Sequence, residues 1–215
     1  MSIDPTLRDA LAAVTPASLA RALTRAGLRA FSPRGLAANS GSATAVGPAH
    51  TLRMVPARGE GAGDLAGAIE AVPAGAVVVI DAGGSGVPLP FAAILAARLS
   101  SRGALALVTD AGLSEDVALP AWSAAATAEG GLVLAATGEP VAVRGAAIHP
   151  GDIVVCAPAG VVAVPAELAE QVALEAVEQQ RLDLWLQREV ERGGRLDGLL
   201  PPDTDARARF EAETR

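Results

Sequence analysis

Two short, continuously apolar segments constrain the fold of this chain more than any other feature. Residues 76–80 read AVVVI and residues 104–109 read ALALVT. Strands without a polar face are typical of parallel sheets that are covered on both sides. A helix expected over 91–99 lies between the two segments, which makes them a strand–helix–strand unit. The sequence therefore predicts an α/β fold.

The rest of the chain extends this unit into one domain with a tail. We expect, in chain order, two short helices within 6–27, a loop over 28–41, a strand over 43–54, a helix over 64–72, short strands over 131–136, 140–148, 153–157 and 160–164, and a long helix over about 166–192. The short strands are separated by Gly/Pro turns, as in a meander or a small barrel. We assign residues 1–193 to the α/β domain. Residues 194–215 form a C-terminal extension that packs on this domain or on a neighbouring subunit.

Several classes of enzyme are excluded by residues that the chain lacks. All 17 basic side chains are arginines, so no lysine is present to form a Schiff base, to hold pyridoxal phosphate or to complete a P-loop. The single cysteine, Cys156, cannot form an intrachain disulfide or a thiolate zinc cluster. Since His50 and His149 are the only imidazoles, a bound metal would depend on carboxylates and water, which favours Mg²⁺ or Mn²⁺.

Charge and hydropathy limit the possible partners. The formal net charge is −7 and no run of basic residues is present, so we expect no binding to nucleic acid. The N-terminus lacks the basic start and the unbroken apolar run of a signal peptide. No apolar segment reaches the roughly 18–20 residues that a membrane span needs. We therefore expect a cytoplasmic protein that does not bind a membrane.

Residues 81–116 contain the candidate ligand site. They predict a strand, a glycine loop, a helix, a second strand, and a turn that closes on Ser114, Glu115 and Asp116. This order brings a helix N-terminus and polar side chains to one edge of the sheet, where small anionic ligands bind. No positive side chain stands at this edge, although an anion site would favour one.

Several segments of the chain resemble the RraA-like family. They are GAVVVIDAGG, FAAILAARLSSRG, VTDAG, RGAAIHPGDIVV with GVVAVP, and GLLPP, and the similarity covers roughly residues 15 to 210. The family includes class II 4-hydroxy-4-methyl-2-oxoglutarate aldolases and regulators of RNA degradation. The resemblance implies a swivelling β/β/α domain, with a long C-terminal helix and tail here, that assembles into homotrimers or hexamers with sites between subunits.

The resemblance also implies roles for individual residues. In the aldolases, the segment that matches 92–95 begins a helix whose backbone N–H groups hold the pyruvate carboxylate, so Ile94 and Leu95 are expected to bind substrate. The family then has an Arg-Asp pair, in which Arg stabilises the enolate and Asp anchors a divalent ion. Ser114 and Glu115 replace this pair and are the candidate catalytic residues. Glu115 and Asp116 are the candidate ligands of Mg²⁺ or Mn²⁺.

Further departures from the family weaken the expected chemistry. Gly84 and Ser85 of the first loop and Arg98, one helical turn beyond Ile94, complete the expected substrate-binding set, although Ser85 stands where the family commonly has Asp. An acidic pair of the family is also replaced, by Ala157 and Ala159. Loss of a group that stabilises a developing oxyanion typically costs on the order of 10²–10³ in rate. The usual aldol cleavage is therefore expected to be impaired.

Each of these features also has a purely structural explanation. Ser114 followed by two acids is a typical helix N-cap with favourable first-turn carboxylates. Residues 83–86 fit a tight turn that lets the backbone approach a ligand, without the lysine of a phosphate-binding loop. Arg98 also fits a surface or interface side chain. Four other residues are expected to be structural: Asp81, Asp110, His149 and Cys156.

Three function classes remain open. The leading one is a lyase that cleaves a small 2-oxo acid, a carboxylate substrate, with the help of a divalent ion. The second is a pocket repurposed for metal-free isomerisation or cyclisation of a more apolar substrate. The third is a non-catalytic regulator that binds a partner protein through the surface of its oligomer.

Overall fold

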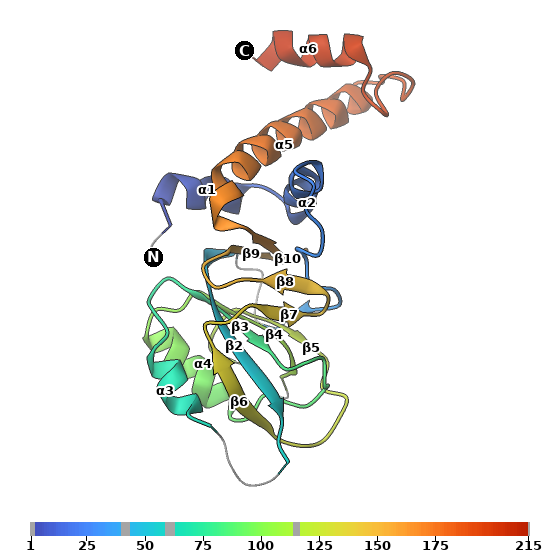
Figure 1. The fold of residues 1–215 in the computed structure, drawn as a ribbon. Helices are drawn as coiled ribbons and strands as arrows, with labels where there is room; N and C mark the ends of the chain where they lie inside the picture. Colours follow the sequence, from blue (N-terminus) through green and yellow to red (C-terminus); the bar gives the residue numbers. More distant parts are fainter. Residues whose placement is uncertain (1–2, 40–43, 59–62, 114–116, 215) are drawn as a thin grey trace.

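The secondary structure follows the expected α/β order. The computed structural model describes residues 3–39, 44–58, 63–113 and 117–214 (Figure 1). Its helices are α1 (Pro5–Ala13), α2 (Pro16–Arg25), α3 (Leu65–Glu70), α4 (Ala92–Ser101), the 3₁₀ turn η1 (Ala166–Leu168), α5 (Ala169–Glu191) and α6 (Thr204–Thr214). Its strands are β1 (Ala37–Ala38), β2 (Ala45–Pro56), β3 (Val77–Asp81), β4 (Ala106–Gly112), β5 (Ala121–Ala124), β6 (Leu132–Thr137), β7 (Val141–Val143), β8 (Ala146–Ile148), β9 (Ile153–Ala157) and β10 (Gly160–Val164). No described helix is both long and apolar enough to cross a membrane.

A parallel sheet forms the centre of the molecule. Strands β2, β3, β4 and β5 are parallel neighbours, and the complete order is β1-β5-β4-β3-β2-β9-β10 with β6 also on β2. Every residue of β3 and β4 is buried, because helices α3 and α4 cover one face of the sheet and the β7–β8 hairpin lies on the other (Figure 1). The expected α/β fold with a long C-terminal helix is confirmed.

The long strand β2 joins the parallel sheet to the β-rich second half of the chain. On one side, residues 49–53 of β2 pair with β3. On the other side, residues 45–48 pair with β9 and residues 52–56 pair with β6, both antiparallel. Strands β6 and β9 are therefore attached to the parallel sheet through one strand, whereas the β7–β8 hairpin forms a separate two-stranded sheet.

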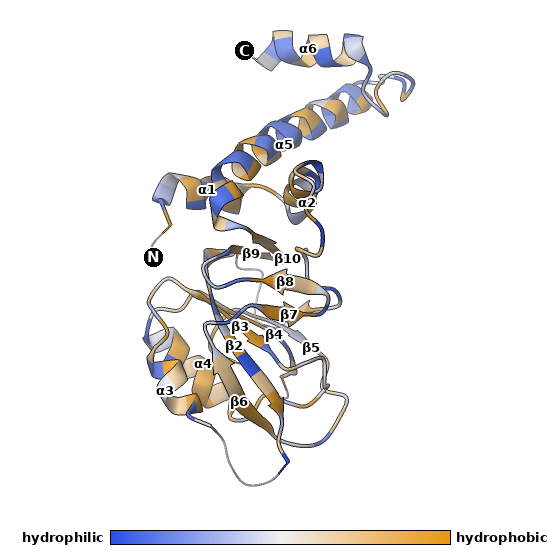
Figure 2. Cartoon of the chain, in the orientation of Figure 1, coloured by the Kyte–Doolittle hydropathy of each residue, from blue (hydrophilic) through white to orange (hydrophobic). Residues whose placement is uncertain are grey.

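Three apolar clusters fill the body. The first lies between the sheet and helices α3 and α4 and contains Ile80 and Leu99, both 0% exposed. The second lies under the β7–β8 hairpin and contains Trp122 and Cys156. Burial raises the pKa of the Cys156 thiol, as expected for an unreactive core residue. The third joins β9 and β10 to α1, α2 and the first half of α5, where Val172 is buried. Figure 2 shows the central strands mainly in the hydrophobic colours and α5 in mixed colours.

Helices α5 and α6 form an arm that extends from the body (Figure 1). The first half of α5 packs on α1 and α2, whereas a separate apolar cluster joins its second half to α6. The members of this cluster are Leu182, Trp185, Leu186, Leu199, Ala206 and Phe210. The rings of Trp185 and Phe210 meet edge to face with centroids 6.0 Å apart. The division of the chain at residue 193 stays a prediction.

Three short or polar elements are not predicted from the sequence. Strands β1 and β5 contain 2 and 4 residues, too few to show a periodic pattern. Helix α6 has 11 residues, of which Ala206 and Phe210 are buried. Two apolar positions at i, i+4 spacing do not make the broad stripe that predicts an amphipathic helix. The other expected elements lie where the sequence places them, and the segment 140–148 is the β7–β8 hairpin.

His50 is a half-buried residue whose Nε2 atom lacks a compensating hydrogen bond among the described residues. It lies in β2 opposite Val78 of β3, and its Nε2 atom is buried with no hydrogen-bond partner among the described residues. Burial lowers the pKa of His50, so the folded state favours the neutral ring. The unfolded chain, with an ordinary histidine pKa of about 6.5, therefore takes up the proton first as the pH falls.

We expect His50 to make the fold less stable in mild acid. A lowered pKa contributes stability that is present above the ordinary pKa and is lost as the pH falls through the lowered one. The melting temperature of the wild type should therefore fall between about pH 7.5 and about pH 5.5 by more than that of His50→Leu. The control variant His149→Gln removes the other histidine, whose ring is 63% exposed, and should keep the wild-type difference. Equal falls in wild type and His50→Leu would contradict this role.

Candidate functional site

The candidate site lies where β3, β4 and the start of α4 meet. Strand β3 ends at Asp81 and β4 ends at Gly112, and because the two strands are parallel, both ends reach the same edge of the sheet. Residues 82–86, here named the glycine loop, leave β3 at this edge, and residues 87–91 lead from the loop to α4. This is the edge at which the sequence predicts a ligand.

The Asp110 carboxylate holds the glycine loop in place. Its Oδ1 atom accepts a hydrogen bond from the Ala82 N–H at 2.5 Å, and its Oδ2 atom accepts one from the Gly84 N–H at 2.7 Å. The residue is only 2% exposed. Burial raises the pKa of Asp110, and the N–H donors of Ala82 and Gly84 oppose this rise. Both oxygens are therefore committed to the loop.

Asp81 connects the same loop to the β7–β8 hairpin. Its Oδ1 atom accepts a hydrogen bond from the Gly83 N–H at 2.7 Å, and its Oδ2 atom accepts one from the Ala142 N–H of β7 at 3.2 Å. Carboxylates at strand ends commonly bind the N–H groups of the following turn. The structural role expected for Asp81 and Asp110 is confirmed by these bonds.

The first three N–H groups of the glycine loop already donate hydrogen bonds to side chains of the protein. Consecutive N–H groups at Ala82, Gly83 and Gly84 bind Asp81 and Asp110, and the two glycines have φ of +64° and +61°. Successive N–H groups of this kind form a concavity that favours an anion, and here two internal carboxylates take that place. The backbone approach expected at Gly84 therefore offers no N–H donor to a substrate.

The end of β4 also fixes the path from the loop to α4. The Leu89 N–H donates to the Gly112 carbonyl at 2.9 Å, and the Gly112 N–H donates to the Val87 carbonyl at 3.2 Å. Glycine is required at this position, because a Cβ on Gly112 would lie 2.5 Å from the Cα of Ala126. Ser85 turns its hydroxyl back onto its own loop, where Oγ accepts from the Val87 N–H at 3.3 Å.

Helix α4 begins with unoccupied backbone donors. Phe91 precedes the helix in the left-handed conformation, with φ 53° and ψ 33°, and no side chain caps the helix. The Leu95 N–H donates to the Phe91 carbonyl at 2.9 Å. The N–H groups of Ala92, Ala93 and Ile94 have no acceptor among the described residues, as is general for the first turn of a helix. Of the two expected donors, Ile94 is free and Leu95 is occupied.

Two large apolar side chains flank these free donors. Phe91 is 71% exposed and Ile94 is 69% exposed, whereas Leu95 is partly buried against the core under α4. Sequence reasoning missed Phe91. The signal that could have indicated it is an aromatic residue at the cap position, where Ser, Thr, Asp or Asn normally satisfies the helix N-terminus.

Arg98 is engaged away from the start of α4. Its Nε and Nη2 atoms donate to the two carboxylate oxygens of Glu70 in α3, each at 2.7 Å. Arg102 adds a third bond to Glu70 at 3.2 Å. The Arg98 bond is the main cause that lowers the pKa of Glu70. The structure therefore shows Arg98 as a surface ion-pair residue, the alternative that its sequence position left open.

The candidate catalytic and metal-binding residues Ser114, Glu115 and Asp116 lie outside the described residues. In the part of the chain that the structure describes, no group of three His, Cys, Asp or Glu could hold a metal ion. Asp81 and Asp110, the carboxylates at this edge, are occupied by backbone donors. An Mg²⁺ or Mn²⁺ site would therefore depend on Glu115 and Asp116.

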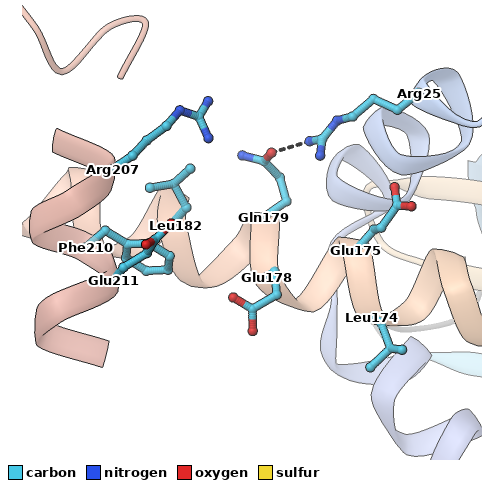
Figure 3. Close-up of a pocket in the computed structure, with 9 residues that line it drawn as sticks. All are labelled: Arg25, Leu174, Glu175, Glu178, Gln179, Leu182, Arg207, Phe210 and Glu211. Carbon is cyan, nitrogen blue, oxygen red and sulfur yellow. Dashed lines mark hydrogen bonds between the residues drawn. The ribbon is translucent and has the colours of Figure 1, made fainter. Parts of the chain in front are cut away.

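A separate hollow of about 350 Å³ lies along α5, remote from this edge (Figure 3). Arg25 and Arg207 extend toward Gln179 from opposite sides, and Arg25 donates to the Gln179 side-chain oxygen. Glutamates 175, 178 and 211 and the apolar side chains of Leu174, Leu182 and Phe210 complete the lining. Charges of both signs line this hollow, so it favours no single class of ligand.

We expect Asp110→Asn to loosen the glycine loop. The new side-chain NH₂ group must face the Ala82 N–H or the Gly84 N–H, which removes one charge-assisted hydrogen bond of the loop and costs about 1–3 kcal/mol. Loss of the buried charge offsets part of this cost. The free energy of unfolding in urea measures the effect. Asp64→Asn is the matched control, because Asp64 caps α3 at the surface and Asn caps equally well. Equal small effects of both variants would contradict the anchoring role.

Known proteins share this architecture. The family model described as RraA-like, Aldolase/RraA, matches residues 6–163. RraAS2 from Streptomyces coelicolor, described as an unusual member of the RNase ES inhibitor RraA protein family, is 26% identical; the match covers 87% of this chain and 98% of that chain, with a TM-score of 0.76. An uncharacterised protein from Pseudomonas syringae pv. tomato is 24% identical over 97% of this chain and 96% of that chain, with a TM-score of 0.81.

A third similar structure matches a smaller share of this chain. The RNA-processing inhibitor RraA from Thermus thermophilus is 22% identical over 62% of this chain and 83% of that chain, with a TM-score of 0.50. At this identity the likeness concerns the fold alone. The family model, in contrast, spans most of the present sequence, including the glycine loop, α4 and β4. The chain is a member of the RraA-like family.

Proposed function

We propose that the protein is a lyase that binds the carboxylate of a small 2-oxo acid at the start of α4 and cleaves a carbon–carbon bond in it. The observation that carries this proposal is the row of N–H groups at Ala92, Ala93 and Ile94 that have no acceptor among the described residues, in a helix whose leading segment is bonded to the end of β4. Helix N-termini attract anions through such donors and through the helix dipole. Backbone donors do not depend on side-chain identity, so this half of a carboxylate site persists in a divergent sequence.

The reaction would form an enolate at the carbon next to the oxo group. In a retro-aldol cleavage, a hydroxyl group loses its proton, the carbon–carbon bond breaks, and the electron pair of that bond becomes the enolate, which is then protonated. In decarboxylation, carbon dioxide leaves in place of the carbonyl fragment. Ser114 would donate one neutral hydrogen bond to the developing charge. The arginine of related aldolases would supply charge-assisted bonds, which are about twice as strong.

A divalent ion would complete this site. Glu115 and Asp116 provide carboxylate oxygens, which Mg²⁺ and Mn²⁺ prefer. Such an ion would supply positive charge to the oxygen of the enolate. We further propose that the protein acts in the cytoplasm as a homotrimer or hexamer, and that residues 194–215 are an extension of the domain formed by residues 1–193.

A second candidate is a non-catalytic regulator that binds another protein. The observation that favours it is the exposure of Phe91 and Ile94, 71% and 69%, at the position where a small polar substrate would bind. Exposed apolar side chains that form a contiguous patch mark contact surfaces. The similarity to RraAS2, from a family of RNase ES inhibitors, points in the same direction. The same apolar surface also suits a more apolar substrate that reacts without a metal.

We expect slow release of pyruvate from oxaloacetate and from 4-hydroxy-4-methyl-2-oxoglutarate in the presence of Mg²⁺ or Mn²⁺. The double variant Ser114→Arg/Glu115→Asp should be faster by about 10²–10³, because it restores the charged donor. Ser100→Arg, which adds the same charge at the exposed C-terminal end of α4, should leave the rate unchanged. Steady-state kinetics with a pyruvate-coupled assay, repeated in EDTA, measures these rates.

The same assay separates the alternatives. Absence of turnover in both the wild type and the double variant with either metal ion would reject the lyase. Turnover of an apolar substrate that persists in EDTA would favour the metal-free reaction. Inhibition of a ribonuclease by the wild type, lost in the surface variant Phe91→Ser, would favour the regulator.

A further inference from the structure

We propose that Arg34 and Arg144 form a binding site for a doubly charged oxyanion of the phosphate type. The site lies on the β7–β8 hairpin, where its turn meets the segment that precedes β1. Both arginine side chains line one open hollow of about 360 Å³ together with Gly35. This site goes beyond the proposed lyase function and shares no residue with it.

The backbones that carry the two arginines are bonded to each other. The Arg34 N–H donates to the Arg144 carbonyl at 3.2 Å, and the Arg144 Nε donates to the Arg34 carbonyl at 3.1 Å. Gly35 leaves room for the guanidinium, since a Cβ at this position would lie 3.2 Å from the Arg144 Nη2 atom. The Arg144 side chain is therefore oriented by the protein before any ligand binds.

Neither guanidinium has an acidic partner in the described ranges 3–39, 44–58, 63–113 and 117–214. Other surface arginines do, such as Arg98 with Glu70 and Arg21 with Asp183. The hollow therefore holds two positive charges that no described acidic side chain neutralises, although the chain has a net charge of −7. A guanidinium offers parallel N–H donors that match the oxygens of a phosphate group.

The backbone at Arg144 adds an independent argument. Arg144 and Gly145 are the central residues of the two-residue turn between β7 and β8, and both have positive φ, +46° and +86°. Asn, Asp and Gly normally occupy the first of these positions, because a longer side chain is strained there. Residues in sparsely populated backbone conformations cluster at functional sites. The hydrogen bond from the Arg144 side chain to the exposed Arg34 carbonyl does not by itself require an arginine, since water can replace that bond.

The charge of the hollow selects the class of anion. Two guanidinium groups balance the two charges of a phosphate group, whereas a single carboxylate would leave one of them unpaired. The phosphate can be inorganic phosphate or the terminal group of a phosphate monoester, because both present the same oxygens. Arg34 and Arg144 would each bind one or two oxygen atoms of the phosphate group.

Titration of the wild type with inorganic phosphate tests the site. Amide signals of Gly35 and Gly145 in ¹⁵N-correlated NMR spectra should shift and saturate with inorganic phosphate or with glycerol phosphate, and should not respond to acetate at equal ionic strength. A response to both compounds identifies the phosphate group itself as the ligand. A stronger response to glycerol phosphate identifies a monoester. Lack of saturation with both compounds, or an equal response to acetate, overturns the proposal.

Two variants distinguish binding from a structural role. Arg34→Gln and Arg144→Asn should each weaken phosphate binding by about tenfold or more, whereas Arg188→Gln, which removes an exposed arginine of α5, should not. Since Asn tolerates positive φ, Arg144→Asn should also raise the melting temperature by about 2–4 °C. A lower melting temperature together with unchanged phosphate binding would show that Arg144 only supports the hairpin, which would overturn the proposal.

Discussion

The candidate site depends on one buried carboxylate at the end of β4. Asp110 has no positively charged partner in the part of the chain that the structure describes; its charge is stabilised by the N–H groups of Ala82 and Gly84. The dependence is mutual, because without Asp110 the buried N–H of Ala82 and the partly buried N–H of Gly84 would lose their acceptor. A loop fixed in this way sets the direction in which the chain returns to the sheet and the point at which α4 begins.

Backbone and side chains contribute separately to the candidate site. The backbone part consists of the glycine loop, which the Asp110 side chain holds in place, and the N–H donors at the start of α4. It survives most substitutions on the surface of α4. The side-chain part consists of Ser114, Glu115 and Asp116, and it differs from the pattern of the aldolases. A fold that keeps the first part while the second part changes can support different activities within one family, since function is set by the site rather than by the fold.

The sequence predicts the body of the protein well, because continuous apolar strands and glycine turns are strong local signals. It also places Asp81 and Asp110 at strand ends facing turns. It does not show which N–H groups of α4 lack an acceptor, because that depends on the exact first residue of the helix. A shift of one residue decides whether the Leu95 N–H is available to a ligand or bonded within the helix. It also cannot show that Arg98 binds Glu70, which is distant in sequence and becomes a neighbour only when α3 packs beside α4.

The pairing of β2 with three different strands has a consequence for how this chain can change in evolution. Insertion or deletion of one residue near the middle of β2 would move its following side chains to the opposite face of the sheet. These residues would lose their register against β3 and β6, whereas the preceding residues would keep theirs against β9. No single partner strand could compensate by slipping. Length variation among related chains should therefore fall in the connections on either side of β2, and the strand itself should keep a constant length.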